Sequence, residues 1–184
     1  MKRFLVLAAL VVLVAVAASS ALGRIAGPGA TAGCAKGAVA AKVGLSGRAV
    51  AVLPDEVSAE RARKGAERAG VLVELEVAPP TRLPLENDAF DLVVIDDTGG
   101  LLAGLSASDR TTTMIESRRI LRAGGRLMVI GAVPKGGLSG LFARAPAVPR
   151  TDPTPLLTSD QFRSVRTLAE RDGLVFVEAL KPRS

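Results

Sequence analysis

Few side chains in this chain are equipped for chemistry, and the most suggestive are carboxylates that follow short apolar runs. Asp96 and Asp97 come directly after the run LVVI, and Asp55 stands two residues after the run RAVAVL. A carboxylate at the carboxyl end of a buried strand is placed to contact a ligand or to act as a general base. Paired carboxylates there are also common in ordinary loops, and we favour that interpretation for Asp96 and Asp97.

The residue types that the sequence lacks exclude several kinds of site. The 184 residues contain no histidine and one cysteine, Cys34. Ser-His-Asp triads, histidine bases and histidine metal sites are therefore excluded, as are an intrachain disulfide and a site built from several thiolates. No partner base is evident for Cys34, so we interpret it as a small packing residue and expect no metal.

The charge is modestly basic, at +6, which suits a solvated surface or a domain that faces anionic headgroups or an acidic partner. The chain has no tryptophan or tyrosine and five phenylalanines. Without stacking platforms or an arginine-rich cluster, nucleic-acid binding is not expected.

The amino-terminal segment predicts a membrane anchor. Residues 4–22 are apolar except for Ser19 and Ser20, and as a helix they would span about 28 Å, close to the hydrocarbon core of a bilayer. The rival is a cleaved signal peptide, with Lys2 and Arg3 as its basic region and a small-residue cleavage site at residues 15–17. We predict that the segment is retained, which divides the chain into an anchor (residues 1–22), a Gly/Ala-rich linker with a short helix at 35–43 (residues 23–46), and an α/β domain (residues 47–184).

Strand and helix patterns alternate through that domain. Apolar, β-branched runs predict strands at 48–53, 71–77, 90–95 and 126–130. Between them we predict helices at 58–69, with Ser58 or Asp55 as N-cap, and at 110–122, with Met114, Ile115, Arg118 and Leu121 facing inward. This alternation indicates βαβ units and a mostly parallel sheet. Residues 162–169 have helical spacing, yet Asp172-Gly173 before residues 174–180 indicates a hairpin.

Two segments resemble the carboxyl half of the class I S-adenosylmethionine-dependent methyltransferases: LPLENDAFDLVVI (residues 83–95) and ESRRILRAGGRLMVIG (residues 116–131). The resemblance extends over roughly residues 27–182. It implies a Rossmann-like α/β domain with a mostly parallel sheet, here behind one transmembrane helix. It also implies a C-terminal antiparallel hairpin formed by residues 163–170 and 174–180.

The positions where that family holds its cofactor are mostly changed here. In the glycine-rich turn at 27–33, Gly29 and Gly33 remain, but Gly27 stands where the family has an acidic residue. Leu53 stands where the family has the carboxylate that binds the ribose, and Pro79 stands where it has the aspartate near the adenine. We therefore expect no cofactor. The alternative is S-adenosylmethionine held by Gly29, Gly33 and a displaced Asp55.

The segment 134–155 is long, rich in glycine and proline, and expected to contain no helix or strand. Its apolar and basic residues predict a contact with a partner or with the membrane interface: Leu138, Leu141, Phe142, Lys135, Arg144 and Arg150. Alternatively, Leu141 and Phe142 fold back and cap the sheet.

Together these features predict a non-catalytic, methyltransferase-like accessory subunit of a larger protein complex in a bacterial inner (cytoplasmic) membrane. Its expected partners are integral membrane subunits and the lipid bilayer. The charges that flank residues 4–22 do not decide the topology, so the cytoplasmic side is expected only by analogy with the fold. The alternatives are an active membrane-bound methyltransferase acting on a quinone or lipid, and a secreted or periplasmic binding domain.

Overall fold

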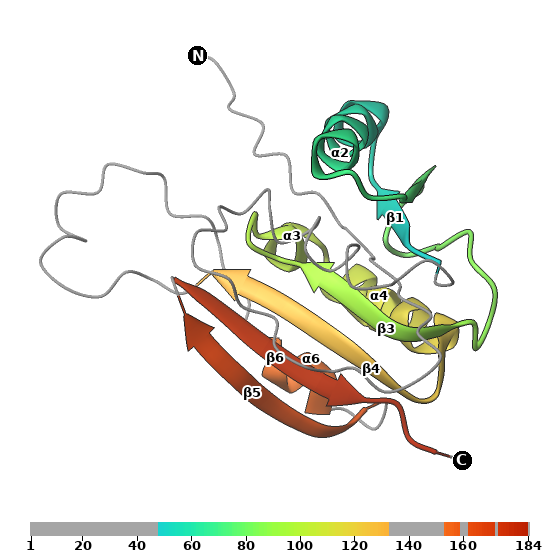
Figure 1. Ribbon diagram of the computed structural model, residues 1–184. Helices are drawn as coiled ribbons and strands as arrows, with labels where there is room; N and C mark the ends of the chain where they lie inside the picture. Colours follow the sequence, from blue (N-terminus) through green and yellow to red (C-terminus); the bar gives the residue numbers. More distant parts are fainter. Residues whose placement is uncertain (1–47, 133–152, 159–161, 172, 184) are drawn as a thin grey trace, which may run out of the picture.

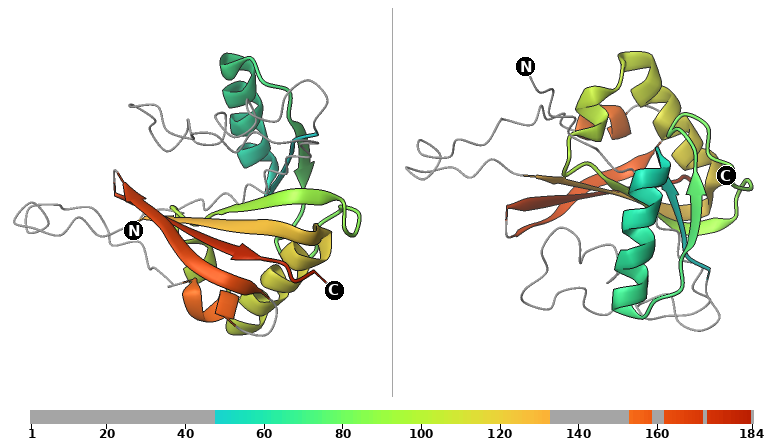
Figure 2. Two further views of the ribbon diagram at one scale, coloured as in Figure 1. Left: turned by 60° about the horizontal axis from the view of Figure 1, so that its bottom comes forward. Right: turned by 90° about the horizontal axis from the view of Figure 1, so that it is seen from above.

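The computed structural model describes residues 48–132, 153–158, 162–171 and 173–183 (Figure 1). In this part of the chain a layer of strands lies between α2 (Glu56–Ala69) on one side and α3 (Leu101–Gly104), α4 (Ala107–Ile120) and α6 (Thr154–Thr158) on the other (Figure 2). Helices on both faces of a largely parallel set of strands make this the predicted Rossmann-like α/β architecture.

The first βαβ unit joins β1 (Val50–Leu53) through α2 to β2 (Glu74–Val77), and the two strands pair in parallel. Asp55, one of the two N-caps that the sequence offered, is the N-cap of α2, and Gly70 ends the helix in the left-handed conformation at φ 63°. The second strand begins later than predicted. The Val71 N–H donates to the Ala66 carbonyl at the end of α2, and Leu72 is 95% exposed.

The second sheet has the order β3-β4-β6-β5. Strands β3 (Phe90–Asp96) and β4 (Leu121–Ala132) are parallel, whereas β6 (Leu174–Leu180) runs antiparallel to both β4 and β5 (Arg163–Arg171). The hairpin interpretation of residues 163–180 is thus confirmed, and the helical spacing at 162–169 is overridden by strand pairing.

The inward face predicted for α4 is wrong for Ile115, which is 48% exposed. Leu121 is completely buried as predicted, but it already belongs to β4. The buried residues of α4 are Thr113, Met114, Ser117 and Ile120. The hydroxyls of Thr113 and Ser117 donate to the carbonyls four residues earlier, at 2.7 and 2.8 Å, so these small polar side chains are buried with their hydrogen bonds satisfied. A buried helix face that contains small polar residues cannot be predicted from the spacing of apolar residues.

The short helices α3 and α6 were not predicted. Helix α6 starts at Thr154, inside the segment 134–155 that was expected to contain no regular element. Most of that segment, residues 134–152, lies outside the described residues, as do residues 1–47. Among the described helices none is long and apolar enough to cross a bilayer. The predicted anchor at 4–22 stays a prediction.

The main-chain conformation near the start of β4 requires glycine at positions 124 and 125. Gly124 has φ 77°, and a Cβ on Gly125 would lie 2.8 Å from the Arg122 carbonyl oxygen and 3.2 Å from that of Phe90. The two main chains can approach this closely only without a side chain. The chain's C-terminal end secures the turn from outside, because the Gly124 N–H donates to the Lys181 carbonyl and the Lys181 N–H to that of Gly125.

An ion pair on α4 holds the chain that connects the two sheets. The Leu83 N–H donates to Glu116 Oε2 at 2.8 Å, and the Arg119 guanidinium donates to the carbonyls of Leu83 and Leu85 at 2.9 and 2.7 Å. Arg119 also bonds both carboxylate oxygens of Glu116 at 2.8 Å. The pair keeps Leu83 and Leu85 in the core, where each is at least 90% buried.

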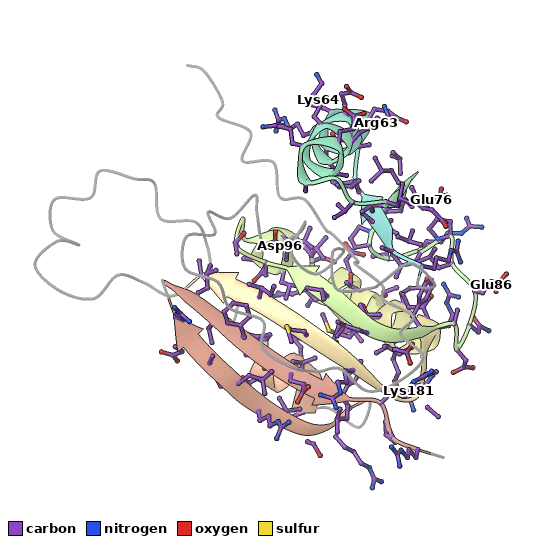
Figure 3. The ribbon with its side chains drawn as sticks, in the orientation of Figure 1. Arg63, Lys64, Glu76, Glu86, Asp96 and Lys181 are labelled. Atoms are coloured by element: carbon purple, nitrogen blue, oxygen red, sulfur yellow. The ribbon has the colours of Figure 1, made fainter. Side chains whose placement is uncertain are left out.

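Replacing Arg119 by alanine should destabilise the domain by about 2–4 kcal/mol, because the Leu83 and Leu85 carbonyls and the Glu116 carboxylate all lose the hydrogen bonds of the guanidinium. Chemical denaturation measures the change. The matched control is Arg63→Ala. Arg63 pairs with Glu60 at the same helical spacing, but on the exposed outer side of α2 (Figure 3), where such a pair contributes about 0–1 kcal/mol. Equal losses in the two variants would contradict this role for Arg119.

Candidate functional site

The carboxyl ends of β1 and β3 are the candidate site, because ligands of open α/β sheets bind outside the carboxyl ends of the strands. The arrowheads of β1, β3 and β4 point the same way in Figure 1. Leu53 and Asp55 lie at the end of β1, Asp96 and Asp97 at the end of β3, and Pro79 two residues beyond β2.

Leu53 is a core residue. Its side chain is 1% exposed and belongs to a cluster with Ala49, Ala51, Ala59 of α2, and Val94 and Ile130 of the second sheet. It supplies no hydrogen-bond acceptor, and its burial leaves no space at this position for a polar group to reach a ligand.

Asp55 uses both carboxylate oxygens at the start of α2. Oδ1 accepts the Ser58 N–H at 2.8 Å, and Oδ2 accepts the Ser58 hydroxyl at 3.1 Å. Of the two caps that the sequence offered, Asp55 and Ser58, the structure uses Asp55. The buried Ser58 donates its hydroxyl to the second oxygen of Asp55. These two bonds fix the carboxylate at the start of α2, although each oxygen can accept a further hydrogen bond.

Pro79 opens a tight turn, in which its carbonyl accepts the Arg82 N–H at 3.1 Å. Beside this turn lies a shallow, open groove of about 640 Å³, lined by Val77, Ala78, Pro79, Arg82, Leu83, Pro84, Leu85, Glu86 and Arg119. Of its charged side chains, Arg119 is engaged with Glu116, and Glu86 lies near the start of β3, at the opposite end of that strand from Asp96 (Figure 3). Sequence reasoning missed this groove. The prolines 79, 80 and 84 were the signal for the extended chain that forms it.

Asp96 and Asp97 also bond within their own loop. Asp96 Oδ1 accepts the N–H and the hydroxyl of Thr98 at 3.0 and 2.6 Å. Asp97 is 6% exposed, and its Oδ1 accepts the Leu102 N–H at 2.7 Å at the start of α3. Burial raises the pKa of Asp97; the Leu102 N–H opposes that shift, and the negative charge of Asp96 adds to it.

The described residues thus bring Leu53, Asp55, Asp96 and Asp97 to the ends of β1 and β3, while Pro79 lies beyond β2. Gly27, Gly29 and Gly33, and the predicted contact residues Leu138, Leu141, Phe142, Lys135, Arg144 and Arg150, lie outside the described residues, so those predictions stay untested.

Comparisons with known proteins identify the same architecture. Residues 30–129 match the family model described as a methyltransferase domain. A crystal structure of an S-adenosylmethionine-dependent methyltransferase from Aquifex aeolicus is similar with a TM-score of 0.62 and 16% identity, over 78% of this chain and 73% of that one. A methyltransferase of the same description from Methanosarcina mazei gives 0.52 and 19%, over 73% and 82%.

The fold is also shared with a protein named for another reaction. The [4+2]-cyclase SpnF is similar with a TM-score of 0.51 and 15% identity, over 73% of this chain and 66% of that one. A comparison with curated proteins found no match. At these identities the solved structures establish the fold and not the reaction.

Asp97→Asn should raise the thermal midpoint more at about pH 7 than at about pH 4. Because its pKa is raised in the folded chain, protonated Asp97 stabilises the fold and ionised Asp97 does not. This stabilisation is fully present below the ordinary pKa of 3.8 and is lost as the pH rises through the folded-state pKa. The amide oxygen of asparagine still accepts the Leu102 N–H, but it does not ionise. Thermal unfolding at the two pH values measures the effect.

The control for this comparison is Asp97→Ala, which removes the acceptor and should lower the midpoint at both pH values. A loss of stability in Asp97→Asn that is equal at the two pH values would show that ionisation of Asp97 carries no cost in the folded chain.

Proposed function

The chain belongs to the methyltransferase domain family, and we propose that it is a member without methyl transfer, acting as an accessory subunit of a membrane protein complex. The family's framework is retained in the described residues: the parallel strands, Gly124-Gly125 at the start of β4, and the antiparallel hairpin. What has changed is the set of polar groups that the family uses to hold S-adenosylmethionine.

The observation that carries the proposal is at the end of β1. Where the resemblance places a carboxylate for the ribose, this chain has Leu53, buried between α2 and the second sheet. The nearest carboxylate, Asp55, already bonds Ser58 through both of its oxygens. Any rotation of this carboxylate toward a ligand would uncap α2, at a cost of about 1 kcal/mol.

The position after β2 adds a second lost contact. Pro79 has neither a carboxylate nor a backbone N–H to offer an adenine, and its carbonyl is held by Arg82 in the turn. Each lost hydrogen bond to a buried ligand group weakens binding by about 1–3 kcal/mol. Gly27 also stands where the family has an acidic residue. Together these losses raise the dissociation constant by several powers of ten.

The membrane part of the proposal is supported by the sequence. Residues 4–22 have the length and composition of a bilayer-spanning helix, and residues 134–155 combine apolar and basic side chains. We place the domain at the inner membrane, on its cytoplasmic side, with Leu138, Leu141 and Phe142 toward a partner or the membrane interface.

A second candidate is an active methyltransferase with a lipophilic acceptor, a quinone or a lipid. The observation that favours it is Asp97, a carboxyl of raised pKa at the carboxyl end of β3, suited to a general base. Such an enzyme would hold S-adenosylmethionine through Gly29, Gly33 and Asp55. Asp97 is committed to the start of α3, which is why this function ranks second.

Isothermal titration calorimetry of the detergent-solubilised full chain should show no saturable heat with S-adenosylmethionine up to about 1 mM. The Aquifex aeolicus methyltransferase of the same fold serves as the comparison protein for the assay. A dissociation constant in the low micromolar range would overturn the loss of cofactor binding and move the second candidate to first place.

The contact role of residues 134–155 predicts that replacing Leu138, Leu141 and Phe142 together with serine releases the chain from its complex and leaves its thermal midpoint unchanged. Co-purification from solubilised membranes and thermal unfolding measure the two effects. Leu168→Ser is the control, because Leu168 is an apolar side chain 44% exposed on β5 and outside residues 134–155 in the sequence.

Two other outcomes would contradict the contact role of residues 134–155. If the triple variant unfolds at lower temperature and still co-purifies with its partners, these side chains cap the sheet and the contact surface lies elsewhere. Retention of both the midpoint and the partners would remove the segment from the proposal altogether.

A further inference from the structure

The arginines of β5 lie on one face of the sheet, although the spacing of a regular strand would separate them. Side chains of a regular strand alternate between two faces. Arg163 and Arg166 would then face opposite sides, and so would Arg166 and Arg171. The register of β5 against β6 shifts twice, between Arg163 and Arg166 and between Thr167 and Ala169. Each shift inserts one extra residue into β5, as a β-bulge does, and so turns the next arginine back to the same face.

That face is the one on the side of α2. The residues of β6 that pair with the three arginines are Leu180, Glu178 and Leu174, which alternate regularly along that strand. Leu174 packs on the side of α2, in the cluster that contains Ala59 of that helix. Arg126 of β4 pairs with Leu180 and therefore points the same way. Four arginines thus share this face of β4, β6 and β5: Arg126, Arg163, Arg166 and Arg171.

One buried carboxylate holds two of these guanidinium groups beside each other. Glu178 is 2% exposed; its Oε1 accepts from Arg126 at 3.0 Å, and its Oε2 accepts from Nε and Nη2 of Arg166 at 3.0 and 2.8 Å. A negative charge between two positive ones offsets their repulsion. The side chains of Arg126 and Arg166 stay 41% and 64% exposed, so both still present charge and N–H groups to the surface.

The rest of the chain offers little negative charge to neutralise this face. Helix α2 lies over the first sheet, and no described helix lies over β5 and β6 on that side (Figure 2). Residues 1–47 contain no aspartate or glutamate. The other undescribed segments hold Asp152, Asp160 and Asp172, equal in number to their own basic residues Lys135, Arg144 and Arg150. The arginine face therefore suits an anionic surface outside the chain.

We propose that the arginine face of β5 binds the phosphate headgroups of anionic lipids, an inference that rests on the membrane anchor of the proposed function. Guanidinium groups bind phosphate oxygens through paired hydrogen bonds, and basic side chains near an anionic leaflet add to its attraction. An anchor at residues 4–22 keeps the headgroups close to the domain at all times, whereas an acidic protein must first be recruited.

The position of β5 agrees with this partner. The strand forms one edge of the sheet, at the periphery of the molecule (Figure 1). Ala132, at the end of β4, pairs with Leu174, which in turn pairs with Arg171. The segment 134–155, with its own basic residues, therefore leaves the sheet beside one end of the arginine row, so a single membrane surface can meet both.

Chemical modification of arginine with phenylglyoxal, measured by mass spectrometry on the full chain in lipid nanodiscs, tests the proposal. Arg163 and Arg171 should react about fivefold or more slowly in nanodiscs with about one-third phosphatidylglycerol than in pure phosphatidylcholine. Salt at about 0.5 M should remove the difference. Arg82 is the internal reference, because it is exposed beside β2 at the other edge of the layer, and its rate should not change.

The double variant Arg163→Gln/Arg171→Gln spares the Arg126–Glu178–Arg166 cluster. It should let Arg166 react in anionic nanodiscs as fast as in neutral ones, because the neighbouring charges that hold the headgroups are gone. Arg61→Gln/Lys64→Gln on α2 removes the same charge and should leave Arg166 protected.

Three results would separate the alternatives. Equal reaction rates of Arg163 and Arg171 in neutral and anionic nanodiscs would overturn the proposal. Protection that appears only with co-purified membrane subunits, whatever the lipid, would assign the face to an acidic protein and overturn it as well. A chain that does not co-elute with neutral nanodiscs lacks the anchor, so the proposed function fails; slower modification when anionic nanodiscs are added would then still support the headgroup site, and an unchanged rate would contradict it.

Discussion

The guanidinium of Arg119 is the contact on which the arrangement of the two sheets depends. The chain between β2 and β3 is the covalent link from one sheet to the other, and it has no helix or strand of its own. Arg119 and Glu116 supply the hydrogen bonds that regular structure would otherwise supply, to Leu83 and Leu85. Glu116 holds the pKa of Arg119 above its ordinary value, and Arg119 lowers that of Glu116, so both stay charged at any physiological pH.

A similar use of polar groups determines what the carboxyl ends of the strands can do. In an enzyme, carboxylates at this rim would be left available for a ligand. Here Asp55 caps α2, Asp96 accepts from Thr98, and Asp97 accepts from the Leu102 N–H in α3. These bonds use acceptor oxygens of all three carboxylates within the fold. The scaffold of the family is thus kept while its polar site is used by the fold itself, which is the physical basis for proposing a subunit that recognises partners instead of transferring methyl groups.

The sequence predicted those elements whose signals are local. The apolar run that became β3, the Asp55 and Gly70 ends of α2, and Gly124-Gly125 could all be interpreted without tertiary information. The hairpin at 163–180 had a local signal in Asp172-Gly173, and the family resemblance supported it against the helical spacing of Phe162, Val165 and Leu168. The buried face of α4 was missed because Thr113 and Ser117 satisfy their hydroxyls inside the helix. The pairing of Asp55 with Ser58 was beyond sequence reasoning, which could offer either residue as the cap but not their mutual bond.

The most direct test of the central claim is the backbone amide resonance of Ser58 during a titration of the full chain with S-adenosylmethionine. This N–H reports whether Asp55 remains bonded to the start of α2 or turns toward a ligand. A resonance that does not move up to about 1 mM is the predicted result, because the carboxylate is held at the start of α2 and Leu53 offers no acceptor beside it. A saturable shift of the Ser58 resonance would show that the cofactor binds beside Asp55, and would contradict the account of this chain as a methyltransferase fold without its cofactor site.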